Sequence, residues 1–96
     1  MIKHIVLFKF KDENKEVFMK QIKEELENLT GIIEELKGME VGLNFLSNND
    51  MPDLSLTSTF DNKEGLSVYA NHSEHLKVVA KIKPMAIGRW VVDYEI

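Results

Sequence analysis

The chain has 96 residues, 44% of them hydrophobic and 29% charged, with a formal net charge of -4 and no cysteine. This composition predicts one globular domain, residues 1–96, small enough that oligomerisation would help its stability. The lack of cysteine excludes disulfides, thiolate metal ligands and a cysteine nucleophile, and the acidic excess disfavours nucleic-acid binding, which needs a basic patch. No segment has the length of a membrane span or the layout of a secretory signal, so we expect a cytoplasmic protein that does not bind membranes.

The first half of the chain predicts a strand, a helix and a second strand. Residues 1–10 alternate in a way that indicates a strand with apolar side chains on both faces. Asp12 is suited to cap a helix that extends to about Leu29. Residues 39–46 alternate again and predict the second strand, and the turn formers of residues 47–53 predict a hairpin loop. The apolar stripe of the helix follows steps of four, four and three residues: Phe18, Ile22, Leu26 and Leu29.

The second half predicts a third strand, an interrupted helix and a last strand. Residues 54–60 form the strand, and residues 61–64 resemble a capping box that opens a helix. The same capping pattern recurs further on, so we expect the helix to jog at Asn71 and to continue to about Ile82. Residues 89–96 predict the last strand.

The resulting order, βαββαβ, predicts an α+β fold of the ferredoxin-like kind, in which a four-stranded antiparallel sheet carries both helices on one face. The second face is apolar as well, because Ile5 and Leu7 on the first strand and Val91 on the last lie opposite their strands' main apolar faces. The helices of one chain cover only one face. We therefore expect a homodimer that packs sheet to sheet, a dimeric α/β barrel.

One helical stretch brings a phenol and two imidazoles together. Tyr69, His72 and His75 follow one another at i,i+3 spacing, which places them near one face of a continuous helix. His4, in the first strand, would join them only if that helix packs beside that strand. Such a group in an apolar site suits proton transfer on a small molecule. A metal site built from these histidines and Glu74 lacks a known zinc spacing, so we expect no metal and no cofactor.

Each of these residues also has a structural interpretation. His4 on an apolar strand face can be a partly buried histidine whose hydrogen bonds are satisfied. Tyr69 can pack on the sheet with its hydroxyl bonded to a neighbour. His72 can be a surface residue beside the helix jog, which leaves His75 as the best functional candidate.

Several segments together resemble one family over essentially the whole chain, the stress-responsive dimeric α/β-barrel domain family (Dabb). The segments are residues 2–11, 40–44, 53–56 with 60–61, 69–79 and 91–94. The chain departs from the family pattern at Ser73, where a proline commonly follows the histidine. Most family members have no assigned reaction.

The resemblance includes a plant polyketide cyclase that forms olivetolic acid by intramolecular aldol condensation. Its matching positions imply His75 as general base, Tyr69 as hydrogen-bond donor to a carbonyl or enolate, and His4 as a pocket residue. We assign His75 and Tyr69 as catalytic candidates and His4 and His72 as binding candidates.

Three functions then stand open. The first is a stress-responsive domain of unassigned activity that binds a small apolar or oxo compound between sheet and helices. The second is a cofactor-free cyclase or isomerase with His75 as base, and the third is a purely structural dimerisation module. A roomy cavity would favour the first two, and a filled core would favour the third.

Overall fold

The computed structural model describes residues 1–46 and 50–96. Ser47, Asn48 and Asn49 of the predicted hairpin loop lie outside the described residues. No helix in these two ranges is both long and apolar enough to cross a membrane. The elements in chain order are β1 (Ile2–Phe10), α1 (Lys15–Asn28), a 3₁₀ turn η1 (Leu29–Gly31), β2 (Gly38–Leu43), β3 (Leu54–Phe60), α2 (Lys63–Asn71), α3 (Ser73–Ile82) and β4 (Ala86–Glu95).

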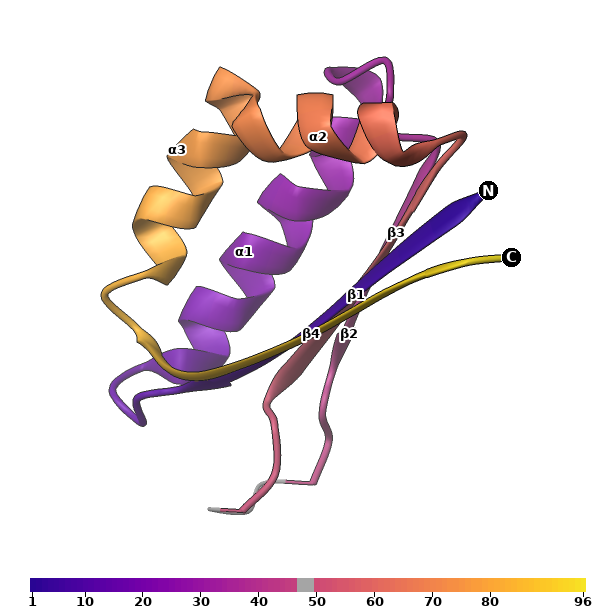
Figure 1. The fold of residues 1–96 in the computed structure, drawn as a ribbon. Coiled ribbons are helices and arrows are strands. Elements are labelled where there is room, and N and C mark those ends of the chain that lie inside the picture. The colour runs from indigo at the N-terminus through magenta and orange to yellow at the C-terminus, as the bar shows by residue number, and fades with distance from the viewer. Residues whose placement is uncertain (47–49) are drawn as a thin grey trace.

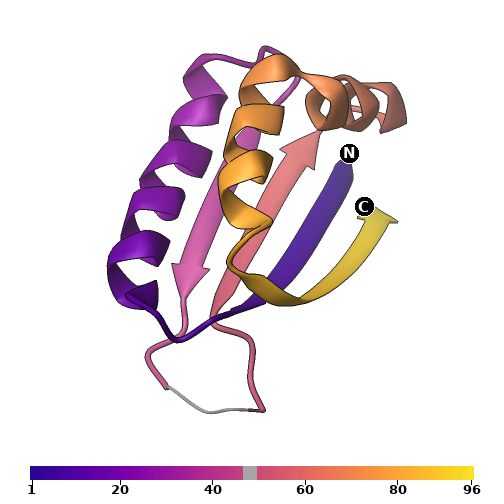
Figure 2. The same cartoon turned by 90° about the vertical axis from the view of Figure 1, so that its left-hand side faces the viewer.

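The four strands form one antiparallel sheet in the order β2-β3-β1-β4. The helices of residues 1–46 and 50–96 lie on one face of this sheet, and none of them covers the other face (Figure 1). Figure 2 shows α1 and α3 running side by side across the sheet, with α2 at the end near both termini. The predicted ferredoxin-like α+β fold is confirmed.

The core lies between the sheet and the helices. Alternate residues of β1 point to the helices, and Ile2, Val6 and Phe10 are almost fully buried there. Ile22 and Leu26, on the apolar stripe of α1, belong to the same core and are each 1% exposed. Burial of such an apolar face stabilises an amphipathic helix. His4 is the polar exception on this face of β1.

The register of β4 differs from the expectation. In the β1–β4 ladder His4 pairs with Asp93, Val6 with Val91 and Phe8 with Arg89. Directly paired residues share a face, so Val91 lies on the helix side of the sheet and its predicted position on the outer face was wrong. The outer side chains of β4 are instead Trp90, Val92 and Tyr94, all more than 40% exposed. The strand also begins earlier than predicted, at Ala86, with a register shift in the ladder between Lys9 and Phe10.

Two helix starts also differ from the expectation. Helix α1 begins at Lys15 and its N-cap is Asn14, which adopts a left-handed conformation (φ 51°), so the predicted cap at Asp12 was wrong. The Asp12 carboxylate instead accepts a hydrogen bond from Lys15 Nζ (3.0 Å). The break between α2 and α3 falls at His72, not at Asn71. His72 is extended, and its Nδ1 accepts from the Glu74 N–H at 3.1 Å, so this histidine caps α3.

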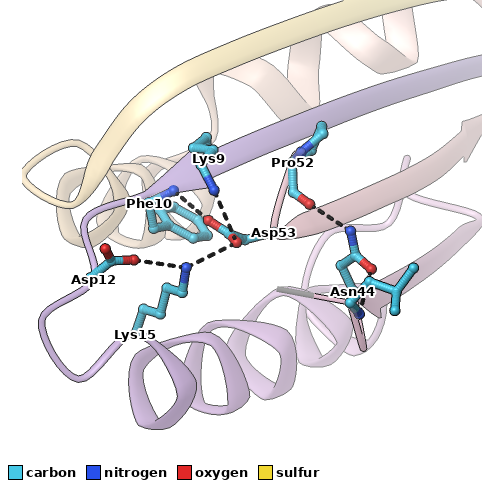
Figure 3. Close-up of polar contacts among 8 residues, drawn as sticks. Lys9, Phe10, Asp12, Lys15, Asn44, Pro52 and Asp53 are labelled. Carbon is cyan, nitrogen blue, oxygen red and sulfur yellow. Dashed lines mark hydrogen bonds and ion pairs between the residues drawn. The ribbon is translucent and has the colours of Figure 1, made fainter. Parts of the chain in front are cut away.

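The Asp53 side chain, just before β3, forms polar contacts with β1 and α1 at one end of the sheet (Figure 3). Its side chain is 5% exposed; Oδ2 accepts from the Phe10 N–H at 2.8 Å, and Oδ1 lies 3.2 Å from Lys15 Nζ and 3.6 Å from Lys9 Nζ. Burial raises the pKa of the Asp53 carboxyl, but the Phe10 and Lys15 hydrogen bonds outweigh it and hold the pKa below its usual value. The carboxylate therefore stays charged and joins β1, α1 and β3.

Replacing Asp53 with alanine should lower the free energy of unfolding by about 3 kcal/mol, because a buried N–H loses its acceptor and two lysines lose a counter-charge. Urea unfolding measures this. The matched control is Asp12→Ala, whose side chain is 83% exposed and should change stability by less than about 0.5 kcal/mol. The Asp53 contribution should be present at neutral pH and disappear as the pH falls through its depressed folded pKa. Equal losses in both variants would contradict the role given to Asp53.

Candidate small-molecule site

A cavity of about 690 Å³ lies between the α2–α3 segment and strands β1 and β4. This volume falls in the range of sites that hold small molecules. Most of the residues that line it are apolar. The lining residues are His4, Val6, Phe8, Leu26, Leu56, Leu66, Tyr69, Ala70, His75, Leu76, Val79, Ile82, Lys83, Ala86, Arg89 and Asp93.

Tyr69 is the most buried polar residue of the cavity. It is 1% exposed, and its ring packs 5.2 Å from Phe60 and 4.2 Å from the His75 ring, centroid to centroid. Burial raises the pKa of its hydroxyl above the usual value of 10.0, so the hydroxyl is a protonated donor at any physiological pH. No described residue hydrogen-bonds this hydroxyl, and a buried hydroxyl without a partner is costly.

His75 is held in one tautomer. Its Nδ1 lies 3.1 Å from the Ala70 carbonyl oxygen, which can only accept, so Nδ1 carries the proton and Nε2 carries a lone pair in the neutral ring. Burial lowers the pKa of His75 despite the opposing Ala70 hydrogen bond, and the nearby His4 and Arg89 lower it further. The ring is therefore neutral at pH 7 and can accept a proton at Nε2.

His4 reaches the same cavity from β1 and is oriented by Asp93. The Asp93 carboxylate pairs with His4 Nδ1 directly across the β1–β4 ladder. With the carboxylate oxygen as the acceptor, Nδ1 donates, and Nε2 is left to face a ligand. The His4 side chain is 14% exposed, which fits a residue in the cavity wall.

The structure brings His4, Tyr69 and His75 together but does not bring His72 to the cavity. The His72 imidazole is engaged as the cap of α3, and the Glu74 carboxylate pairs with Lys77 Nζ at 2.8 Å. Among the described residues, no three histidine, aspartate or glutamate side chains are close enough to hold a metal ion.

Sequence reasoning missed three charged residues of the cavity lining, Lys83 on the α3–β4 connection and Arg89 and Asp93 on β4. The alternation of β4 could have revealed Arg89 and Asp93. Residues 89, 91, 93 and 95 share one face of the strand and three of them are charged, whereas residues 90, 92 and 94 on the other face are apolar. The apolar set was assigned to the helix side, as for an ordinary amphipathic strand. In fact the charged set faces the helices, because that side of β4 lines the cavity.

Fold and cavity together define a ferredoxin-like domain with a site of small-molecule size. Over residues 2–96 the chain matches the family described as Stress responsive A/B Barrel Domain, or Dabb, and the chain belongs to this family. No curated protein is significantly similar to it.

Three solved structures show how widely the fold is shared. A dimeric protein of unknown function with a ferredoxin-like fold from Bacteroides fragilis is 36% identical, with a TM-score of 0.89 over 99% of this chain and 95% of that one. A dimeric ferredoxin-like protein of unknown function from Thermobifida fusca is 28% identical, with a TM-score of 0.83 over 99% and 90%. A hydroxynitrile lyase from Passiflora edulis is 21% identical, with a TM-score of 0.85 over 99% and 92%; at that identity the likeness concerns the fold alone.

Proposed function

We propose that this domain binds a small, largely apolar oxo compound in the cavity, with the Tyr69 hydroxyl donating a hydrogen bond to the oxo group. The observation that carries the proposal is this hydroxyl itself, which is buried in the cavity wall and has no partner among the described residues. A carbonyl oxygen would supply the missing acceptor, and the apolar walls would take the rest of the ligand. The open cavity favours binding over a purely structural module, whose core would be filled.

Proton transfer is the second candidate function, and the geometry at His75 favours it. The His75 ring lies 4.2 Å from the Tyr69 ring, centroid to centroid, and its Nδ1 faces the Ala70 carbonyl oxygen, so Nε2 would accept the α-proton of a ketone held by Tyr69. Tyr69 would stabilise the enolate that forms, and the His4–Asp93 pair would position a second imidazole. This is the chemistry of a cofactor-free cyclase or isomerase, and it agrees with the resemblance to the plant polyketide cyclase.

We also propose that two copies of the chain form the functional unit. The outer sheet face carries Leu7 beside Trp90, Val92 and Tyr94, and each of these three β4 side chains is more than 40% exposed in one chain. Exposed apolar patches of this kind mark interaction sites. The Bacteroides relative, at 36% identity, is described as dimeric, which supports a second copy as the cover and a barrel between the two sheets.

Binding can be tested with Tyr69→Phe and a medium-chain methyl ketone as the probe. The variant should bind the ketone about tenfold more weakly, the effect of one lost hydrogen bond, while the free protein keeps or slightly gains stability, because a buried unpaired hydroxyl is removed. Calorimetric titration and thermal unfolding measure the two effects. The control is Tyr94→Phe, since Tyr94 is the only other tyrosine and lies outside the cavity. Equal affinity of Tyr69→Phe and the unaltered protein would refute the donor role.

The pH dependence of proton exchange should follow His75. Only the neutral imidazole accepts a proton, so the rate of deuterium uptake by the bound ketone should fall as the pH drops through the His75 pKa. Because burial lowers that pKa, the midpoint should lie below the ordinary value of 6.5 and full activity should persist at neutral pH. A midpoint above 6.5 would contradict this assignment.

A further inference from the structure

The cavity has two chemically different ends. Its first end holds His4, Tyr69 and His75, and its second end holds Lys83 and Arg89. Arg89 pairs with Phe8 and Asp93 pairs with His4, so the backbones at the two ends are four residues apart along the strands, roughly 13 Å. The Arg89 charge is still near enough to His75 to lower its pKa. The β1 and β3 side chains between them are apolar. A ligand that fills the cavity would therefore meet hydrogen-bonding groups at one end and positive charge at the other.

The positive charge at the second end is uncompensated. No described residue forms a hydrogen bond or an ion pair with the side chain of Lys83 or Arg89. The one acidic residue of the cavity lining, Asp93, is engaged by His4. Lys83 and Arg89 are both exposed residues of the cavity lining, so the cationic end lies at the edge of the cavity that faces water.

The type of cation is informative as well. Arg89 is the only arginine among the chain's 12 basic residues, and it lies on the helix-facing side of β4 rather than on the outer side. A guanidinium offers two parallel N–H donors that match a carboxylate, whereas an ammonium acts as a point charge. An inward charge can also protect an edge strand from pairing with other chains, but a lysine would serve that purpose equally well.

We propose that Arg89, assisted by Lys83, binds a carboxylate of the ligand, so that the ligand class is an oxo acid whose carboxylate and oxo group are separated by an apolar segment. The proposal rests on the proposed function, because it takes Tyr69 as the donor to the oxo group. Arg89 fixes the orientation of the ligand, and the apolar segment lies along Val6, Phe8 and Leu56. A neutral ketone would fill the same space without satisfying the cationic end.

A matched pair of probes tests the proposal: a medium-chain keto acid with its carboxylate at the far end from the ketone, and the methyl ester of the same acid. The unaltered protein should bind the acid about ten- to a hundredfold more tightly than the ester, the effect of charge-assisted hydrogen bonds. Arg89→Gln should remove this preference, so that the acid binds no more tightly than the ester. Arg89→Lys should keep part of it, and the control Lys77→Gln, on an exposed lysine of α3 outside the cavity lining, should keep all of it.

The outcomes separate the two proposals. If the ester binds and the acid binds no better, or if Arg89→Gln keeps the preference, carboxylate recognition by Arg89 is overturned while the oxo-binding function stands. If neither probe binds the unaltered protein, both proposals are overturned. Loss of ester binding in Arg89→Gln with an unchanged melting temperature would also overturn the carboxylate role, because it would show that Arg89 contacts the shared part of the ligand.

Discussion

Replacing His75 with alanine should slow the exchange of α-protons in a bound ketone by about 10²–10⁴-fold, the contribution that a positioned general base typically makes. The variant removes the Nε2 lone pair but leaves Tyr69 to hold the oxo group, so ketone affinity should change far less than the exchange rate. Deuterium incorporation from heavy water, followed by NMR, measures the rate. The fold should remain intact, because His75 is only half-buried at the cavity edge.

The matched control is His72→Ala, one helical turn away. His72 caps α3 through its Nδ1, so its loss should cost about 1 kcal/mol of stability without changing the exchange rate. This pair of variants separates catalysis from helix stability. His72→Ala should lower the stability of the protein, and His75→Ala should lower the exchange rate. An unchanged rate in His75→Ala would remove His75 from the mechanism and leave simple binding as the function.

Local patterns in the sequence were sufficient to predict the elements and their order. Residues 54–60 are rich in leucine, serine and threonine, and the third strand has these bounds in the structure. The stripe through Ile22 and Leu26 predicted the face of α1 that is buried. Such signals work because the periods of strand and helix are properties of neighbouring residues. Given the order βαββαβ, connection rules leave few topologies, and the ferredoxin-like one was correct.

Long-range register could not be predicted in the same way. His4 and Asp93 are 89 residues apart in the chain, and no turn between β1 and β4 sets their register. The alternation of β4 was recognisable, but its orientation was inverted: the charged side, with Arg89 and Asp93, faces the helices, and the apolar side faces outward. The ordinary rule that apolar side chains face the core fails here because β4 borders a cavity on one side and an unpaired sheet face on the other.

The cavity itself leaves little trace in the sequence. Its walls are built from Val6, Phe8 and Leu56, residue types that also fill cores, and only three-dimensional packing decides whether space remains between them. Helical spacing predicted that Tyr69 and His75 would approach each other, and they do. The same spacing wrongly grouped His72 with them, because the helix breaks at His72 and turns its side chain into a cap.

Replacing Leu7 with glutamate should convert the protein from a dimer to a monomer at low micromolar concentration. Leu7 lies on the outer sheet face directly opposite Trp90. An obligate interface across this face would be large and apolar, and an unpaired carboxylate buried in it would cost several kcal/mol, which raises the dissociation constant at least a hundredfold. Light scattering should give twice the mass of one chain for the unaltered protein and the mass of one chain for the variant.

The control for this experiment is Val17→Glu. Val17 is also apolar and is 71% exposed, but it lies on α1, on the opposite side of the sheet from the proposed interface. The same chemical change at that position should leave the dimer intact. Loss of the dimer in both variants would indicate general destabilisation, whereas a stable monomer of the unaltered protein would mean that the apolar side chains of β4 remain exposed to water and that the barrel does not form. The contrast between Leu7 and Val17 therefore tests which face of the sheet the second copy covers.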